Sequence, residues 1–260
     1  MADPTRRTIL GGLIAATTVH ALGEERQVAG QQAPSARRRI IVFDVNETLL
    51  DVGALAPEFE RLFGDRAVLQ EWFTNVVLYS QTLTIAGPYT DFGSIARACL
   101  DMTAQARGVM LQAAERDGIL RGLVSLPAHD DVRSSLERLR AAGFRLVTLT
   151  NSAPAAVEQQ LANAGIREFF ERALSVDAVR KFKPSGEVYA IVARELAVPP
   201  SQLRLVAAHA WDVLGAMRAG YAAAFVARRG KALFPLAARP DIVAADLNQV
   251  SSEIVRIDGV

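Results

Sequence analysis

Ile40-Ile41-Val42-Phe43-Asp44 is the stretch that decides the fold of this chain, because four apolar residues end abruptly in a carboxylate. The apolar run predicts a buried strand, and this places Asp44 at the C-terminal end of that strand, before a short polar loop. Ligands of open α/β sheets bind at that edge. A carboxylate there can serve as a nucleophile and form an ester that water later hydrolyses. The simpler alternative is an aspartate that caps a turn.

The alternation of strand and helix recurs in the second half of the chain. After Pro127, strands are predicted at residues 144–149, 173–176 and 203–207, and residues 223–227 are predicted to form the last strand. Amphipathic helices are predicted at residues 130–142, 154–164, 187–196 and 213–219. Repeated units of this kind predict an α/β fold, with a Rossmann-like parallel sheet and helices on both of its faces.

Residues 53–125 interrupt this alternation and are predicted to be helical. Apolar residues recur at helical spacing between Val68 and Leu83, and Asp91 stands where it can cap a further helix. The sequence therefore predicts an all-helical cap domain over residues 53–125. This cap would be inserted into a core domain made of residues 38–52 and 126–250.

Residues 1–35 are expected to lie outside the fold as a signal peptide and linker. Arg6-Arg7 precedes an apolar stretch from Ile9 to Ala21, which is typical of a bacterial twin-arginine signal. The stretch is too short for stable insertion in a membrane. We therefore expect export by the twin-arginine machinery to the periplasm, with a chance Arg-Arg pair as the alternative. Residues 30–39 are predicted to be a disordered linker.

Composition excludes several other classes of protein. The chain has 260 residues, half of them hydrophobic, and a net charge of +1, so no basic field for nucleic acid is evident. Cys99 is the only cysteine, which leaves neither a disulfide nor a cysteine-based zinc site within the chain. The three histidines are far apart in the sequence and show no metal-ligand spacing.

Polar residues follow each predicted strand of the core. Asp44 comes after the first strand, Thr150 and Asn151 after the second, Lys183 after the third, and Asp212 after the fourth. Each alone has an ordinary structural explanation, such as capping the next helix. Because the ends of parallel strands meet at one crevice, we expect these side chains to converge there.

The order of these motifs resembles the haloacid dehalogenase superfamily, and within it the type II (L-2-haloacid) dehalogenases. The resemblance runs from about Ile40 to Arg228 and includes the helical cap. It rests on Phe43-Asp44, Thr48-Leu49, Leu149-Thr150-Asn151-Ser152, Ser175-Val176-Asp177, Lys183-Pro184, Tyr189 and Trp211-Asp212-Val213 with Gly215-Ala216.

This resemblance implies a two-step hydrolysis without metal or other cofactor. Asp44 would displace the halide and form an aspartyl ester, and Asp212 would activate the water that hydrolyses it. Lys183 would offset the charge of Asp44, and Thr48 would hold Asp44 by a hydrogen bond. The resemblance implies substrate-binding positions at Asn46, Phe73, Thr150, Asn151, Tyr189, His209 and Trp211, with Thr150 and Asn151 on the substrate carboxylate.

Two positions discriminate this reaction from that of the superfamily's phosphatases. Phosphatases carry a second aspartate two residues after the nucleophile, where this chain has Asn46. They also carry an acidic magnesium ligand four residues before the equivalent of Asp212, where this chain has Ala208. An alanine side chain offers no oxygen to Mg²⁺.

Three departures from the dehalogenase pattern concern the leaving group. The family usually has Trp-Arg in its first cap helix, where this chain has Trp72-Phe73. It usually has Ser-Ser-Asn where this chain has Ala207-Ala208-His209, and often Gly at the position of Glu47. His209 could replace the amide as a halide donor or assist the water. These changes predict a divergent subgroup with a different halide pocket, for small haloacids.

The leading hypothesis is therefore a periplasmic hydrolase that converts a small 2-haloalkanoic acid to a 2-hydroxy acid. One alternative is another hydrolase on the same core, such as a phosphatase with an unusual metal site. Another is an exported carboxylate-binding protein without turnover. The resemblance also allows a homodimer.

Overall fold

A computed structural model of the chain describes residues 38–259. The predicted signal peptide and most of the predicted linker lie outside these residues. Arg38 and Arg39 are described, and for them the expectation of a disordered linker is wrong. Arg39 donates from Nε to the carbonyl of Ser201 at 3.1 Å and forms an ion pair with Asp258. The ordered core therefore begins two residues before the first strand.

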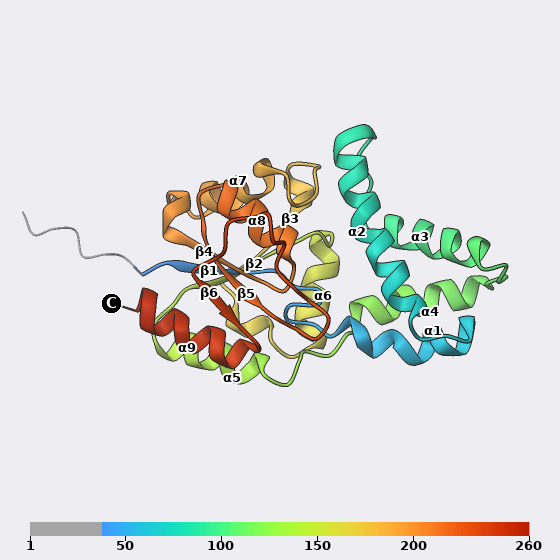
Figure 1. The fold of residues 1–260 in the computed structure, drawn as a ribbon, viewed down its shortest axis with the longest axis horizontal. Helices are drawn as coiled ribbons and strands as arrows, with labels where there is room; N and C mark the ends of the chain where they lie inside the picture. Colours follow the sequence, from blue (N-terminus) through green and yellow to red (C-terminus); the bar gives the residue numbers. More distant parts are fainter. Residues whose placement is uncertain (1–37, 260) are drawn as a thin grey trace, which may run out of the picture. The chain divides into compact units, whose positions relative to one another are not determined.

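The core is a parallel sheet of six strands in the order β3-β2-β1-β4-β5-β6, shown in Figure 1, and the predicted fold class is confirmed. In the central pairing, Val42 of β1 lies opposite Val147 of β2 and Leu205 of β4. The strands are β1 (Ile40–Phe43), β2 (Leu146–Thr150), β3 (Arg172–Ser175), β4 (Leu203–Ala207), β5 (Ala222–Val226) and β6 (Ile242–Ala244).

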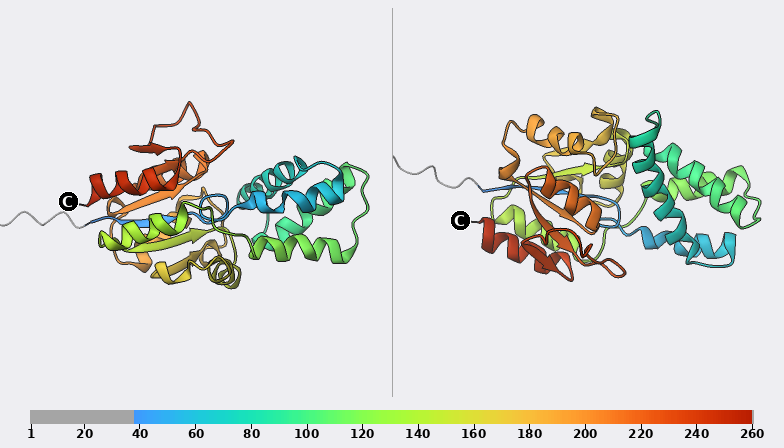
Figure 2. Two further views of the ribbon diagram at one scale, coloured as in Figure 1. Left: turned by 90° about the horizontal axis from the view of Figure 1, so that it is seen from below. Right: turned by 45° about the horizontal axis from the view of Figure 1, so that its top comes forward.

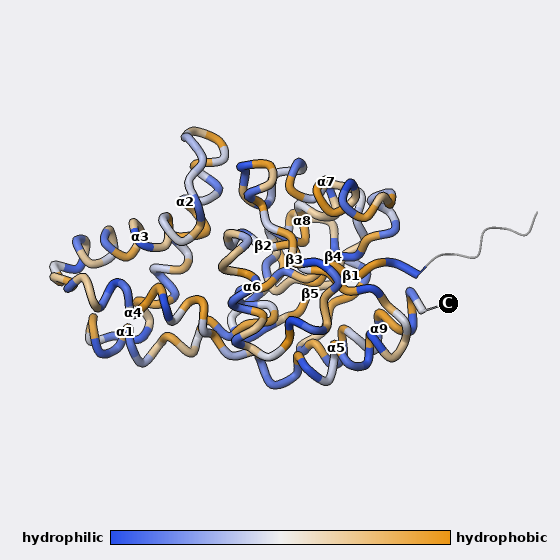
Figure 3. The backbone as a smooth tube through the Cα atoms, turned by 180° about the vertical axis from the view of Figure 1, so that it is seen from behind, coloured by the Kyte–Doolittle hydropathy of each residue, from blue (hydrophilic) through white to orange (hydrophobic). Residues whose placement is uncertain are grey.

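The central strands are apolar because both faces of the sheet are covered. All residues of β1, β2 and β4 are buried, and Figure 3 shows hydrophobic colour concentrated along them. A parallel sheet buried on both faces is expected to read as a continuous apolar run rather than an alternating one. For this reason the sequence of Ile40–Phe43 predicts a strand.

Helices α5 and α9 pack side by side on one face of the sheet, and α7 and α8 on the other, as Figures 1 and 2 show. The predicted helices lie within a few residues of α5 (Val132–Ala141), α6 (Pro154–Asn163), α7 (Gly186–Glu195) and α8 (Ala210–Arg218). Helix α8 begins three residues earlier than predicted, directly after His209. Short 3-10 turns lie at Arg167–Phe169, Val176–Ala178 and Pro200–Gln202.

The expectation that residues 223–227 form the last strand is wrong. Strand β6 follows on the edge of the sheet, and α9 (Leu247–Asp258) then packs against α5. With three residues, β6 is too short to show a period. The sequence does carry a start signal for helix α9, since aspartate is a preferred N-cap residue. In the structure Asp246 caps the helix by accepting a hydrogen bond from the Gln249 N–H at 2.8 Å. The helix also continues past residue 250, the predicted end of the core.

Between β1 and α5 the structure holds helices, and no residue from 52 to 124 belongs to the sheet. Trp72 and Phe73 lie on the second α-helix of this segment rather than the first. The elements are the 3-10 turn Val52–Leu55, α1 (Ala56–Phe63), α2 (Val68–Ala86), α3 (Phe92–Ala106) and α4 (Ala113–Val124).

The helical segment touches the core next to the predicted lysine. The Phe182 N–H donates to Thr84 Oγ1 of α2 at 2.9 Å, and the Phe182 ring stacks on Tyr89 at 5.1 Å between centroids. Among residues 38–259, no helix combines the length and apolar character needed to cross a bilayer.

Candidate active site

The predicted catalytic residues meet where the strand order reverses. Strands β2 and β3 extend the sheet on one side of β1, and β4 to β6 extend it on the other. Asp44 directly follows β1, and Asp212 lies in the first turn of α8, which follows β4. The backbone of Asp44 is tied to β4 by a hydrogen bond from its N–H to the Val206 carbonyl at 3.1 Å. Ligands of open α/β sheets bind at this point of the topology.

The two carboxylate oxygens of Asp44 have different partners. Lys183 Nζ lies 3.0 Å from Oδ1. Thr48 Oγ1 donates to Oδ2 at 2.6 Å, and His209 Nδ1 lies 3.2 Å from the same oxygen. Thr48 is itself fixed, because its hydroxyl accepts the Ala208 N–H at 2.9 Å. Asp44 is therefore held in one orientation by groups from three different segments.

Asp44 is ionised although its side chain is buried. Burial opposes the charged form, but the ammonium of Lys183 and the hydrogen bond from His209 outweigh it. The pKa of Asp44 consequently lies well below its ordinary value. A carboxylate that is both charged and dry is a stronger nucleophile than one in water.

Lys183 is shared between two carboxylates. Its Nζ lies 2.7 Å from Oδ2 of Asp212, and both side chains are fully buried. Tyr189 donates to the other oxygen of Asp212 at 2.7 Å. Burial lowers the pKa of Lys183, but Asp212 and Asp44 raise it further, so the lysine stays charged. Burial and the nearby Asp44 raise the pKa of Asp212 against the pull of Lys183, which suits it to accept a proton.

A second series of paired charged side chains leads from Asp44 toward the surface. His209 Nε2 lies 2.7 Å from Oε2 of Glu47, and Lys231 Nζ lies 2.7 Å from Oε1 of Glu47. Burial opposes the imidazolium form of His209, but hydrogen bonds to Asp44 and Glu47 raise the pKa of His209 to about 9. Burial opposes ionisation of Glu47, yet His209 and Lys231 lower the pKa of that carboxyl. His209 is therefore protonated at neutral pH.

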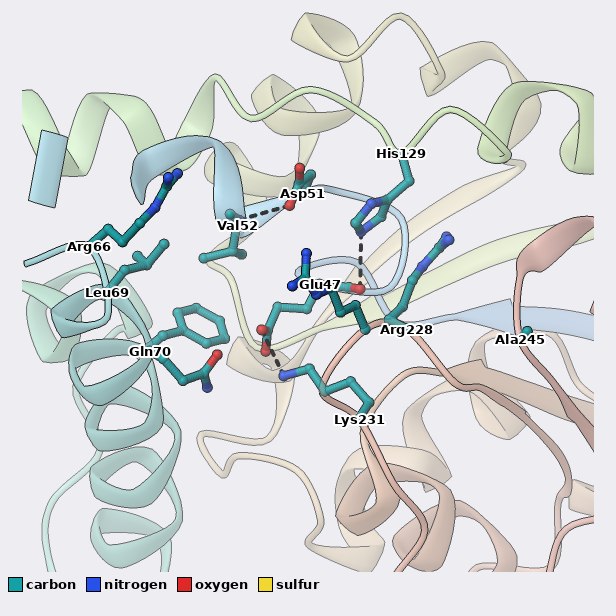
Figure 4. Close-up of a pocket in the computed structure, with 13 residues that line it drawn as sticks. Glu47, Asp51, Val52, Arg66, Leu69, Gln70, His129, Arg228, Lys231 and Ala245 are labelled. Atoms are coloured by element: carbon teal, nitrogen blue, oxygen red, sulfur yellow. Dashed lines mark hydrogen bonds and ion pairs between the residues drawn. The ribbon is translucent and has the colours of Figure 1, made fainter. Parts of the chain in front are cut away.

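Glu47 lines two adjoining cavities between α2 and the core. Figure 4 shows the larger one, of ≈600 Å³, with Glu47 bonded to Lys231 on its wall. The smaller cavity, of ≈270 Å³, reaches His209 and Trp211. Phe73 of α2, at the position where the resemblance implies an arginine, lines both cavities. Trp72 points elsewhere, since its Nε1 donates to the Ala96 carbonyl at 2.9 Å.

Three predicted substrate-binding residues form hydrogen bonds to partners other than Asp44. Asn46 is engaged by the Gln160 side chain at 3.0 Å, and Thr150 Oγ1 accepts the Ser152 N–H at 3.1 Å. Asn151 Oδ1 accepts the backbone N–H of Lys183 at 3.2 Å. Within residues 38–259, no hydrogen bond joins Asn46, Thr150 or Asn151 to Asp44. Their role in binding stays a prediction.

Sequence reasoning left Glu47 without a role and missed Lys231. Glu47 had one visible signal, an acidic residue at a position where the family often has glycine. Lys231 follows β5 in the basic run Arg228-Arg229-Gly230-Lys231. The end of β5 is a fifth strand end at the same edge of the sheet, and the argument from strand ends extends to it.

The donor set does not resemble a magnesium site. Asn46 and Ala208 stand at the two positions where a phosphatase needs carboxylates, and Lys183 already bonds to both Asp44 and Asp212. The part of the chain that the structure describes contains no cluster of three or more His, Cys, Asp or Glu side chains arranged to hold a metal.

Comparison with known proteins gives a consistent result. The family model for haloacid dehalogenase-like hydrolases matches residues 38–220. The chain is 29% identical to (S)-2-haloacid dehalogenase 2 of Pseudomonas sp. (strain CBS-3), over 82% of this chain and 93% of that protein. It is 32% identical to the (S)-2-haloacid dehalogenase of Xanthobacter autotrophicus, over 73% of this chain and 75% of that protein.

A solved structure agrees with this result. The L-2-haloacid dehalogenase of Xanthobacter autotrophicus with chloropropionic acid covalently bound superposes with a TM-score of 0.78, at 28% identity, over 85% of this chain and 99% of that one. The family match spans more than half of the chain and includes strands β1 to β4 together with Asp44, Lys183 and Asp212. The chain belongs to the haloacid dehalogenase-like hydrolase family.

Proposed function

We propose that this hydrolase cleaves the carbon–halogen bond of a small 2-haloalkanoic acid and releases the 2-hydroxy acid. The observation that carries the proposal is the state of Asp44: buried, ionised and fixed by Lys183 and Thr48 at the sheet's binding edge. The dehalogenases to which the chain is similar support the choice of substrate class.

In the first step, one oxygen of Asp44 attacks the carbon that bears the halogen. A carbon–oxygen bond forms, the carbon–halogen bond breaks, and the electron pair leaves with the halide. The attack comes from the side opposite the halogen, so the configuration at that carbon inverts. Oδ1 is the better nucleophile, because it faces one donor, Lys183, whereas Oδ2 accepts from Thr48 and also lies in hydrogen-bonding distance of His209.

In the second step, water attacks the carbonyl carbon of the aspartyl ester. Asp212 accepts a proton from that water, a task for which burial raises its pKa. Lys183 stays between Asp44 and Asp212 and compensates their changing charge. The covalent adduct in the similar Xanthobacter structure supports an ester intermediate.

The substrate carboxylate would lie at the N-terminus of α6, near Thr150 and Asn151, where the positive end of the helix dipole suits an anion. Phe73 and Trp211 form apolar walls of the cavity beside His209. Bulky aromatic walls in a cavity of ≈270 Å³ favour short substrates. Tyr189 acts through Asp212, to which its hydroxyl donates.

An isotope experiment on the full chain tests this proposal. The substrates are fluoro-, chloro- and bromoacetate and both enantiomers of 2-chloropropionate, with halide release as the assay. A single turnover in H₂¹⁸O should give an unlabelled hydroxy acid and one ¹⁸O in the peptide that contains Asp44. Direct attack of water on the substrate would reverse that labelling and contradict the ester mechanism.

Variant Asp44→Asn is the matched control, because it keeps the size of the side chain and removes the nucleophile. Halide release should vanish in it. If the wild type releases no halide but turns over an aryl phosphate with Mg²⁺, the chain is a phosphatase. If it binds haloacids tightly and forms no product, it is a binding protein.

We further propose export of the protein by the twin-arginine route, on the strength of Arg6-Arg7 before the apolar stretch. Replacing both arginines by lysine should leave the protein in the cytoplasm of a bacterial host, whereas the wild type should fractionate with the periplasm. Equal distribution of the two would count against export.

A further inference from the structure

Glu47 occupies a backbone conformation that disfavours any residue other than glycine. Its φ is 62°, in the left-handed region, which costs a side-chain-bearing residue roughly 1 kcal/mol or more. The Glu47 N–H is tied to the Leu50 carbonyl at 2.8 Å. The conformation places the carboxylate between His209 and Lys231, at 2.7 Å from each. Strain of this kind is retained where the geometry serves a purpose.

His209 faces a carboxylate at each ring nitrogen. Nε2 faces Glu47 at 2.7 Å and Nδ1 faces Asp44 at 3.2 Å, and the ring stacks on Trp211 at 4.9 Å. An ionised carboxylate can accept hydrogen bonds but cannot donate them. Both ring nitrogens must therefore donate, and the ring must be an imidazolium. With 8% of its surface exposed, the ring is shielded from solvent.

The ionisable groups around His209 come from four segments of the core. Asp44 and Glu47 come from the loop after β1, Lys231 from the loop after β5, and Asp212 from α8. Lys183 lies on the far oxygen of Asp44. The side chains that α2 contributes to this cavity are uncharged: Gln70, Phe73, Thr74, Val77, Leu78 and Gln81.

The donors on Asp44 Oδ2 are already placed for the second step of the reaction. If Oδ1 attacks the substrate, Oδ2 becomes the carbonyl oxygen of the ester. Negative charge then develops on Oδ2 when water adds to the carbonyl carbon. Thr48 at 2.6 Å and His209 at 3.2 Å both lie within hydrogen-bonding distance of that oxygen.

We propose that His209 is a catalytic residue of ester hydrolysis, donating from Nδ1 to Oδ2 of Asp44 as the oxyanion forms, and that Glu47 is the positioning residue that holds the imidazolium. The proposal rests on the haloacid hydrolysis proposed above. Preorganised donors at a developing oxyanion contribute about 10²–10³-fold to a rate. An imidazolium adds a full charge where the family usually has a neutral amide.

The step balances without any proton leaving His209. The water oxygen bonds to Cγ, one water proton passes to Asp212, and the carbonyl electron pair moves to Oδ2. When that pair returns, the Cγ–Oδ1 bond breaks, and the departing oxygen takes the proton from Asp212 to become the product hydroxyl. The regenerated carboxyl group releases the second water proton to solvent.

Glu47 matters most while the ester is present. Asp44 then carries no charge, and Glu47 is the carboxylate that still bonds to the ring. Variant Glu47→Gln keeps the side-chain size and removes that charge, so the imidazolium of the ester form should lose its proton at lower pH. The matched control is Glu187→Gln, the same change at an exposed residue of α7 that pairs with Lys181.

The experiment follows ester formation and ester hydrolysis separately in the full chain, with 2-chloropropionate as the probe. Rapid quench reports the halide burst, and intact mass reports the acylated protein. In His209→Asn the burst should persist, acylated protein should accumulate, and hydrolysis should slow by about 10-fold, because the amide still donates but carries no charge. In Glu47→Gln the loss of hydrolysis at alkaline pH should begin at lower pH, with the acid limb unmoved.

Two outcomes would overturn the proposal while leaving the proposed function intact. One is a His209→Asn variant that hydrolyses its ester at the wild-type rate. The other is a Glu47→Gln variant in which the acid limb moves to lower pH, since that shift belongs to a neutral imidazole acting as a base. If His209→Asn does not fold, the pH profile of Glu47→Gln decides alone. Absence of halide from the wild type would instead remove the proposed function, and this proposal with it.

Discussion

Lys183 and Asp212 form an ion pair of 2.7 Å in which both side chains are fully excluded from solvent. Pairs of this kind are costly to bury, and removing one member leaves an uncompensated charge. Here the lysine also faces Asp44 at 3.0 Å, so one cation balances two carboxylates. Lys183 is therefore the cation that the two catalytic carboxylates share.

Variant Lys183→Met should abolish most activity. Without the ammonium, Asp44 and Asp212 become two buried like charges, so the pKa of Asp44 should rise and less of it should be ionised. We expect kcat to fall by about 10²-fold or more, with the acid limb of the pH profile moving to higher pH. Steady-state halide release from pH 4 to 9 measures both. Lys181→Met, at an exposed neighbour, should change neither, and an unmoved acid limb in Lys183→Met would contradict this account.

Variant Thr48→Val should weaken both the site and the fold. The hydroxyl donates to Asp44 and accepts from the Ala208 N–H. An isosteric methyl group removes both hydrogen bonds and leaves the buried Ala208 N–H unpaired. We expect a loss of about 1–3 kcal/mol in the free energy of unfolding, together with lower kcat. Urea unfolding and halide release are the measurements. Thr48→Ser keeps the hydroxyl and should restore most of both; a serine variant as impaired as the valine variant would point to packing instead.

Variant Asp258→Asn should destabilise the protein and leave its chemistry alone. Arg204 is fully buried at the start of β4, where Asp258 and Asp241 each pair with it at 2.5 Å. We expect the free energy of unfolding to fall by about 3 kcal/mol, at the low end for a broken buried pair because Asp241 remains. Glu253→Gln, in an exposed pair on the same helix, should cost less than about 1 kcal/mol. Loss of kcat per folded molecule in Asp258→Asn would show that the two ends of β4 are coupled.

Substrate capture should depend on salt. Arg66 and Arg229 line the larger cavity, and neither forms an ion pair with another side chain within residues 38–259. An anionic substrate should be steered by them, so kcat/KM should fall as salt rises from about 0.01 M to about 1 M and the Debye length shrinks from about 30 Å to about 3 Å.

The double variant Arg66→Gln/Arg229→Gln should reduce kcat/KM at low salt and flatten its salt dependence, with kcat unchanged. Arg121→Gln, an exposed arginine of α4 that lines neither cavity, is the control for net charge. A salt slope that is the same in wild type and double variant would exclude steering by these residues.

The core of the fold was predictable because burial on both faces of a parallel sheet leaves a strong apolar signal. Strands β1 and β4 were placed to the residue, and the remaining core elements within a few residues. The edge strand β6 was missed because three residues carry no period. Helix α9 was missed with it, although Asp246 marked its start.

The site was predictable from the polar residues that come after the strands and from the motifs that carry the resemblance. Asp44, Thr48, Lys183 and Asp212 meet because strand ends converge, whatever the rest of the sequence does. The partnership of Glu47 with His209 was not predictable, because it depends on one backbone angle in a tight loop. Lys231 was missed because the argument from strand ends was not extended to β5, and because it lies beyond Arg228, where the resemblance ends.

Strand β4 carries the buried Arg204 cluster at its start, while His209 and Asp212 follow its other end. Five residues of strand span about 17 Å, so the ions that fix the C-terminal helix stand well away from the reacting atoms. Mutations that alter halide handling at Phe73, His209 or Trp211 therefore leave that cluster intact. In natural or directed evolution, the substrate range can therefore change while the contribution of the Arg204 ion cluster to folding stability is kept.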